Sequence, residues 1–145
     1  MKRPGPEHRA AFLHFRALAT RWMDNDVYGH VNNVVYYSFF DTIVNHFLIE
    51  QGVLDVQGGA VVGLVVETQC RYFSPIAFPD VVHAGLRVAH LGNSSVRYEL
   101  GLFRNDENNA SAQGHFVHVY VDRASNRPVP LPQNFKRVLA TLMPG

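Results

Sequence analysis

One short polar stretch, between a predicted strand and a predicted helix, organises the chain. It reads Arg21-Trp22-Met23-Asp24-Asn25-Asp26-Val27-Tyr28-Gly29-His30-Val31-Asn32-Asn33. The stretch brings together two carboxylates, an imidazole and a pair of adjacent amides. Connections on a rigid scaffold are where proteins commonly place binding and catalytic groups. This stretch is therefore the first candidate for a functional site.

The residues that follow predict a long amphipathic helix. Apolar residues recur at the i, i+3, i+4, i+7 spacing of one helical face. They are Tyr36, Phe39, Phe40, Ile43, Val44, Phe47 and Leu48. Asn32 or Asn33 suits the N-cap, where a side-chain oxygen accepts from a free amide. Gly52 suits the left-handed residue beyond the C-terminus, and so wide an apolar face needs a sheet to cover it.

The rest of the chain supplies strands for that sheet. A first, imperfectly alternating strand is predicted from His14 to Met23. Four further segments have strand composition and alternation: Val61–Phe73, Asp80–His90, Ser95–Arg104 and Ser111–Asp122. Short hairpin connections, such as Leu91–Asn93, make the strands antiparallel, and Pro132–Leu142 predicts a short closing helix. The expected fold class is α+β, a five-stranded antiparallel sheet wrapped around one long central helix.

Bulk composition narrows the classes of function. The 145 residues fit a single domain, 1–145, with a mobile tail over 1–10 and a C-terminal extension over 128–145. A net charge of +1 without a basic stripe excludes a nucleic-acid partner. No apolar run reaches the roughly 18–20 residues that cross a membrane. The single cysteine, Cys70, and an N-terminus without an apolar core predict a cytoplasmic location.

The polar stretch also carries a family resemblance. It reads Asp24-x-Asp26-x-x-Gly29-His30-Val31-Asn32-Asn33-x-x-Tyr36, heads a helix and precedes four strands. In this it resembles the 4-hydroxybenzoyl-CoA thioesterase-like family of hotdog-fold proteins, over residues 16–122. Plant-type acyl-carrier-protein thioesterases share the His-Val-Asn-Asn core. The resemblance implies a hotdog fold with active sites at a homodimer interface, in a dimer or tetramer. It also implies hydrolysis of acyl-CoA or acyl-carrier-protein (acyl-ACP) thioesters with no metal and no cofactor.

The resemblance also implies roles for individual residues. Asp26 is the expected catalytic carboxylate, as nucleophile or as base for water. The backbone amide of Asn33 is the expected oxyanion donor. His30 occupies the position of a His that takes part in the plant-type enzymes. Tyr28 departs from that pattern, because the plant-type enzymes have a catalytic Asn there.

Other motif residues are expected to contact the substrate. They are Gly29, Val31, Asn32 and Tyr36, and Gly29 would let the backbone approach the substrate closely. Glu67 is added because it lies in roughly the region of a further catalytic residue of the plant-type enzymes.

The chemistry agrees with these roles. A thiolate leaves readily, so a positioned carboxylate is sufficient to attack the carbonyl or to activate water. A helix N-terminus offers free amides and a partial positive charge to the oxyanion. The helix aromatics behind it could wall an acyl pocket.

Each of these residues also has a structural interpretation. Asp24 and Asp26 could cap the loop and pair with Arg21, and for Asp24 we favour that role. His30 could anchor the loop, Asn32 could be a cap or brace, and Tyr36 could belong to the core. Cys70 is interpreted as a half-buried strand residue. Arginines on the predicted strands could meet CoA phosphates or simply face solvent: Arg71, Arg87, Arg97 and Arg104.

Three rival functions are weighed. A phosphoryl-transfer aspartate would require a larger domain with parallel strands. A calcium loop starting at Asp24 would need oxygen ligands where Tyr28 and Val35 stand. The remaining alternative is a non-catalytic protein that binds acyl thioesters with the same fold.

Overall fold

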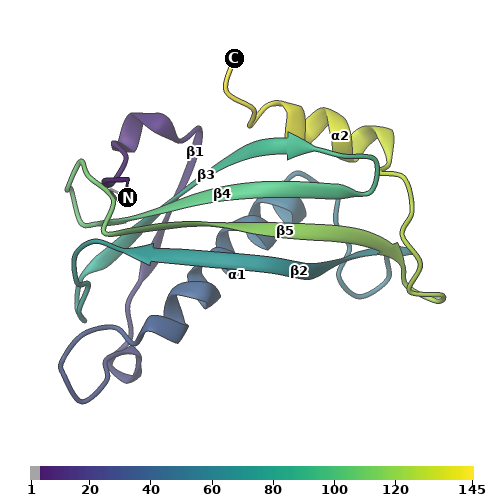
Figure 1. The fold of residues 1–145 in the computed structure, drawn as a ribbon. Coiled ribbons are helices and arrows are strands. Elements are labelled where there is room, and N and C mark those ends of the chain that lie inside the picture. Colours follow the sequence, from purple (N-terminus) through teal and green to yellow (C-terminus); the bar gives the residue numbers. More distant parts are fainter. Residues whose placement is uncertain (1–3) are drawn as a thin grey trace.

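A five-stranded antiparallel sheet curls around one long helix in the computed structural model, which describes residues 4–145 (Figure 1). The strands lie in the order β1-β3-β4-β5-β2, so β1 and β2 form the two edges. The elements are β1 (His14–Ala19), α1 (Asn33–Glu50), β2 (Val61–Tyr72), β3 (Val81–Leu91), β4 (Ser95–Arg104), β5 (Ala112–Asp122) and α2 (Gln133–Ala140). This is the hotdog architecture that the sequence predicts.

Helix α1 forms where the apolar periodicity predicts it. Every residue of the predicted apolar stripe is buried in the main core. Asn32 is the N-cap, and its side-chain oxygen accepts from the Val34 amide at 3.1 Å. Gly52 follows the helix with φ +73°, the left-handed conformation that glycine adopts without strain. Both predicted ends of the helix are confirmed.

The sheet presents one apolar face, its inner face, to α1. Alternate residues of β3 and β4 are fully buried there: Val82, Ala84, Leu86, Val88, Val96, Tyr98, Leu100 and Leu102. On β5 the inner side chains include Phe116, whose ring packs edge-on against Phe40 of α1 at 5.5 Å between centroids. Helix α2 adds Phe135 and Leu139 to the same core. On β3 and β4 the strand alternation therefore predicts correctly which side chains face the helix.

One expectation at the N-terminal end is wrong. Strand β1 ends at Ala19 instead of Met23, because Trp22–Asp24 turn into a 3-10 helix (η2). The mobile tail over 1–10 stays a prediction: residues 1–3 lie outside the described part of the chain, and Arg9 donates its amide to the Asn108 carbonyl at 2.8 Å. The carboxylate of Glu7 pairs with Arg87 at 2.6 Å on the outer face of the sheet. No helix among residues 4–145 is long and apolar enough to cross a membrane.

Candidate active site

The polar loop ahead of α1 is fastened to the connection between β2 and β3. The Val31 amide donates to the Ile76 carbonyl at 2.7 Å. The Phe78 amide donates to the side-chain oxygen of Asn25 at 3.0 Å. Asn25 and Val31 also form a short antiparallel bridge across the loop. The loop is therefore held to this connection at two points, at Asn25 and at Val31.

Asp24 forms part of the framework of this loop. Its side chain is buried and accepts from the Arg21 amide at 2.7 Å. The Arg21 guanidinium adds bonds from Nε at 3.1 Å and from Nη2 at 2.9 Å. The Asp24 carbonyl accepts from the Asn32 amide at 2.9 Å. These bonds hold the first turn of the loop and tie it to the N-cap of α1, which is the structural role favoured from the sequence.

Asp26 has a more open environment. It is half-buried, and its carboxylate Oδ1 accepts from the Tyr28 amide at 2.9 Å. Its backbone closes the same turn, because the Asp26 amide donates to the His30 carbonyl at 2.8 Å and the Asp26 carbonyl accepts from Gly29 at 3.0 Å. Gly29 adopts φ +82°, which this tight turn requires. Among residues 4–145, no hydrogen bond reaches the second carboxylate oxygen of Asp26.

The first turn of α1 leaves one amide available. The Val34 amide is bonded to the Asn32 side chain, and the Val35 amide donates to the Asn32 carbonyl at 2.9 Å. No partner within the described chain accepts from the Asn33 amide, as is usual for the first residue of a helix. This amide carries the positive end of the helix dipole. It is the group that the family resemblance implies as the oxyanion donor.

Tyr72, which the sequence interpretation missed, supports this helix start. Its hydroxyl donates to the Asn33 carbonyl at 3.0 Å, and its ring lies 4.9 Å from that of Tyr36. Only alternation along β2, which turns Cys70 and Tyr72 to the same face, could have suggested the contact.

Burial raises the pKa of the Cys70 thiol to about 11, so the group is a neutral thiol and not a nucleophile at neutral pH.

The other predicted site residues divide into exposed and buried ones. The His30 side chain is exposed, and no hydrogen bond joins it to Asp26 in the described structure. Val31 and Tyr36 are both buried in the core, and desolvation raises the pKa of Tyr36. Within one chain these two side chains therefore lie behind the site and support it.

Glu67 lies on the outer face of the sheet, the face turned away from α1. It stands opposite Val117 of β5, and its carboxylate contacts the Nε2 atom of His115 at 2.8 Å. A bulge between Val65 and Glu67 turns this part of β2 over. One chain therefore does not bring Glu67 to the Asp26 loop.

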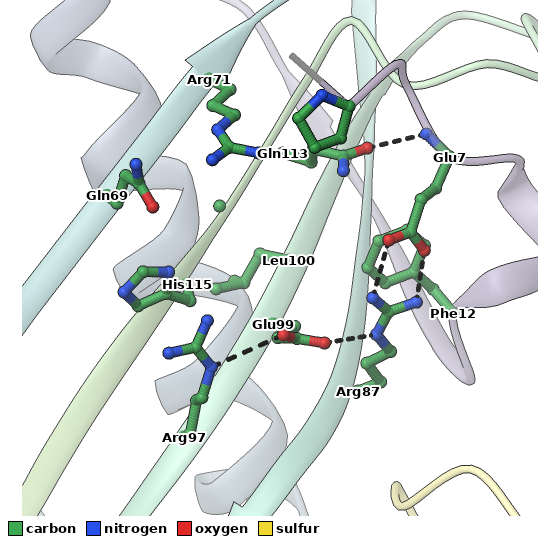
Figure 2. Close-up of a pocket in the computed structure, with 12 residues that line it drawn as sticks. Glu7, Phe12, Gln69, Arg71, Arg87, Arg97, Glu99, Leu100, Gln113 and His115 are labelled. Atoms are coloured by element: carbon green, nitrogen blue, oxygen red, sulfur yellow. Dashed lines mark hydrogen bonds and ion pairs between the residues drawn. The ribbon is translucent and has the colours of Figure 1, made fainter. Parts of the chain in front are cut away.

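Three of the candidate arginines also belong to that outer face. Figure 2 shows Arg71, Arg87 and Arg97 around a polar cleft of about 250 Å³, with α1 behind the sheet. Arg87 is held by Glu7 and by Glu99, the latter at 2.8 Å. These pairs tie the N-terminal segment to the sheet, and the cleft is separated from the Asp26 loop by the thickness of the sheet.

Comparison with known proteins agrees with this architecture. Residues 20–139 match the family model described as the thioesterase-like superfamily. The PA5185 protein from Pseudomonas aeruginosa is 58% identical, with a TM-score of 0.93 over 95% of this chain and 96% of that one. The PA2801 protein from the same organism is 30% identical, with a TM-score of 0.80 over 87% of this chain and 97% of that one. The gentisyl-coenzyme A thioesterase BH1999 shares the fold, at 22% identity and a TM-score of 0.77 over 87% and 99%.

The fold and the polar loop together define a hotdog protein of the thioesterase type. The chain belongs to the thioesterase-like superfamily. Membership supports thioester hydrolysis as the class of activity, as the resemblance in the sequence implied.

Proposed function

We propose that the protein hydrolyses acyl-CoA or acyl-ACP thioesters to a free acid and a thiol, with Asp26 as the reacting carboxylate. One observation carries the proposal. A carboxylate with an uncommitted oxygen and an unpaired helix N-terminal amide, that of Asn33, belong to the same braced loop. Thioester hydrolysis needs these two groups: one to attack or to activate water, and one to receive the oxyanion.

The proposed reaction can begin in either of two ways. Asp26 adds to the thioester carbonyl carbon, or it takes a proton from water while the hydroxyl adds. The carbonyl oxygen becomes an oxyanion and accepts from the Asn33 amide. The carbon–sulfur bond then breaks with its electron pair on sulfur as the carbonyl re-forms. The thiolate leaves and takes up a proton, from Asp26 in the general-base route and from solvent in the nucleophilic route. In the nucleophilic route, water then hydrolyses the mixed anhydride and restores Asp26.

A homo-oligomer is part of the proposal. Strand β2 is twelve residues long, stands at an edge of the sheet, and exposes Leu64, Val65 and Val66. An unpaired apolar edge of this length is a liability that pairing removes. A dimer, or a tetramer built from dimers, would cover it. We further propose a cytoplasmic location, which agrees with a lone thiol at Cys70.

The test is a thiol-release assay over a panel of acyl-CoA and acyl-ACP substrates. The wild-type protein should release thiol from at least one of them. Asp26→Ala should reduce that rate by about 100-fold or more, the usual contribution of a positioned acid or base. Turnover that survives Asp26→Ala unchanged would refute the role of Asp26. Binding of acyl-CoA without turnover of any substrate would favour the non-catalytic acyl-thioester-binding alternative.

A further inference from the structure

The polar cleft on the outer face of the sheet is built on a regular row of side chains. The cross-strand register sets Gln69 of β2 opposite His115 of β5. The row continues with Glu99 of β4 and Arg87 of β3. His115 is buried, and its imidazole Nε2 atom contacts the Glu67 carboxylate at 2.8 Å. The row therefore forms a floor that the fold holds in place.

Most of the charge around this floor is paired within the chain. Arg87 lies between Glu7 and Glu99, with contacts of 2.6 and 2.8 Å. Arg97 makes one long contact, from Nε to the Glu99 carboxylate at 3.5 Å. The Arg71 guanidinium donates to no other group among residues 4–145. The cleft therefore contains one arginine without any partner and a second that is only weakly paired.

Both of these guanidinium groups point into the cleft (Figure 2). The Nη1 and Nη2 atoms of Arg97 have no acceptor in the described chain, and neither has any nitrogen of Arg71. The side-chain oxygen of Gln113 accepts from the Glu7 amide at 2.8 Å, so the NH2 group of Gln113 is also left to donate. The cleft therefore holds more hydrogen-bond donors than acceptors.

The spacing of the two arginines suits a ligand that bridges them. Arg71 stands opposite Gln113 of β5, and Gln113 stands opposite Gly101 of β4, four residues from Arg97. At about 4.8 Å per strand and about 3.3 Å per residue, the two Cα atoms are about 16 Å apart. The side chains extend from opposite sides toward the space above His115, within a cleft of about 250 Å³ (Figure 2).

We propose that this cleft is a binding site for a phosphate group, held between Arg71 and Arg97. A guanidinium group presents parallel N–H donors that match two phosphate oxygens, and it keeps its charge at physiological pH. Gln69 and Gln113 add neutral amide donors at the side of the cleft. The site lies on the face of the sheet turned away from α1, so it goes beyond the proposed hydrolysis at Asp26.

A phosphate fits this arrangement better than a carboxylate does. The two oxygens of a carboxylate lie in one plane and suit one guanidinium group, whereas a tetrahedral phosphate presents oxygens to two. A phosphate monoester carries roughly −1.5 to −2 charges near neutral pH, which two arginines can balance. Such a group occurs on free phosphate and on the nucleotide part of a CoA substrate, and the experiments below separate these two sources.

Calorimetric titration with inorganic phosphate tests the site without any turnover. In about 0.1 M salt, which screens charges more than about 10 Å apart, the wild-type protein should bind one phosphate per chain. Arg71→Gln and Arg97→Gln should each weaken the binding by about 10-fold or more, as expected when charge-assisted hydrogen bonds are lost. Arg137→Gln is the matched control on α2, at an exposed position without an ion pair in the described chain, and should change the affinity by less than about 2-fold.

The variants remain interpretable because Arg71 has no contact that the fold would lose. Arg71→Gln should unfold in urea like the wild-type protein, so weaker phosphate binding can be assigned to the cleft. Wild-type protein that binds no phosphate would overturn the inference. Unchanged affinity in both cleft variants, or an equal loss in Arg137→Gln, would overturn it as well.

The Michaelis constants then identify the source of the phosphate. If the phosphate belongs to the substrate, Arg71→Gln should raise the KM for an acyl-CoA by about 10-fold. The KM for the matching acyl-pantetheine, which has no phosphate, should stay the same. If the site takes free phosphate, neither KM should change although phosphate binding is weakened. An equal rise for both substrates would mean that Arg71 acts on the thioester site and not on a phosphate, and would overturn the inference.

The titration also separates this site from the proposed function. Phosphate binding that depends on Arg71 and Arg97, in a protein that hydrolyses no thioester, would reject hydrolysis and keep the cleft site. Hydrolysis that depends on Asp26, in a protein that binds no phosphate, would reject the cleft site and keep the function.

Discussion

The loop ahead of α1 contains two turns, each closed by an aspartate, and they differ in what surrounds the carboxylate. In the first turn, Asp24 is 2% exposed and receives three hydrogen bonds from Arg21. In the second turn, Asp26 is half-buried and receives one, from the Tyr28 amide. The two carboxylates are only two residues apart in sequence. Both oxygens of Asp24 accept hydrogen bonds within the fold, whereas one oxygen of Asp26 accepts none in the described chain.

Under the proposed function, this difference assigns stability to the first turn of the loop and chemistry to the second. A carboxylate that is buried and paired holds its neighbours, and a substrate cannot reach it without breaking those bonds. A carboxylate with a free oxygen can interact with a new partner at no cost to the fold. We therefore expect substitutions in the first turn to act on folding, and those in the second to act on turnover.

The largest effect is expected for Asp26→Asn. The amide side chain keeps the shape and can still accept from Tyr28, but it can neither attack a carbonyl nor take a proton from water. The value of kcat/KM should fall by about 10²- to 10⁴-fold. The free energy of unfolding should stay within about 0.5 kcal/mol of wild type. Steady-state thiol release and urea unfolding check the two halves of this prediction.

At acid pH a buried histidine, His118, is expected to lower the stability of the fold, independently of any change at the site. Burial lowers the pKa of His118 from 6.5 to about 4. The unfolded chain thus takes up a proton below pH 6.5, while the folded chain does so only near pH 4. Stability present above pH 6.5 is lost as the pH falls through this window, by about 3 kcal/mol in total.

Urea unfolding at pH 7 and pH 4.5 measures this loss. His118→Phe should remove most of the acid dependence, and His90→Gln, at an exposed position, should leave it unchanged. Activity that falls in acid while the His118→Phe protein stays folded can then be assigned to the site. An acid dependence equal in both variants would mean that other groups cause it.

A smaller loss of stability is expected for Asp24→Asn. The substitution leaves a buried amide next to the Arg21 donors and should lower the free energy of unfolding by about 2 kcal/mol. The value of kcat/KM for the remaining folded protein should change less than 10-fold, well short of the Asp26→Asn effect. Thermal unfolding followed by circular dichroism reports the first quantity. A loss of turnover without a loss of stability would reverse the roles of the two aspartates.

The smallest effect is expected for Gly29→Ala in the second turn. An added Cβ would meet no atom within 4 Å, so the cost comes from φ +82° alone, about 1 kcal/mol. Gly52→Ala is the matched control, with φ +73° and equally open space beyond the end of α1. Both variants should lose similar stability in urea, but only Gly29→Ala should lower kcat/KM. Equal activities would show that the shape of the second turn does not matter to the reaction.

The sequence predicted those features that depend on local periodicity. The apolar repeat of α1, its cap at Asn32 and the alternation along β4 each need only neighbouring residues. The end of β1 could not be predicted in this way, because the alternation continues past Ala19 while the Arg21–Asp24 pair bends the chain. The anchoring of Glu7 likewise needs Arg87, a residue far along the chain.

The candidate site divides in the same manner. Asp26 and Asn33 belong to one local motif and could be nominated from spacing and resemblance. The position of Glu67 could not be predicted from the sequence, because unbroken alternation from Val61 would turn its side chain toward α1. The bulge after Val65 turns it to the outer face, where it meets His115. A bulge depends on the pairing with β5, which the sequence of β2 alone does not contain.

Single-turnover thiol release tests the division between the two aspartates most directly. Enzyme in excess over a bound acyl-CoA isolates the chemical step from binding and product release. Asp26→Asn and Asp24→Asn would be measured beside wild type, each at a temperature where all three are folded. The account predicts a rate at least about 100-fold lower for Asp26→Asn and a rate within about 10-fold of wild type for Asp24→Asn. A wild-type rate for Asp26→Asn, or a larger loss for Asp24→Asn than for Asp26→Asn, would contradict it.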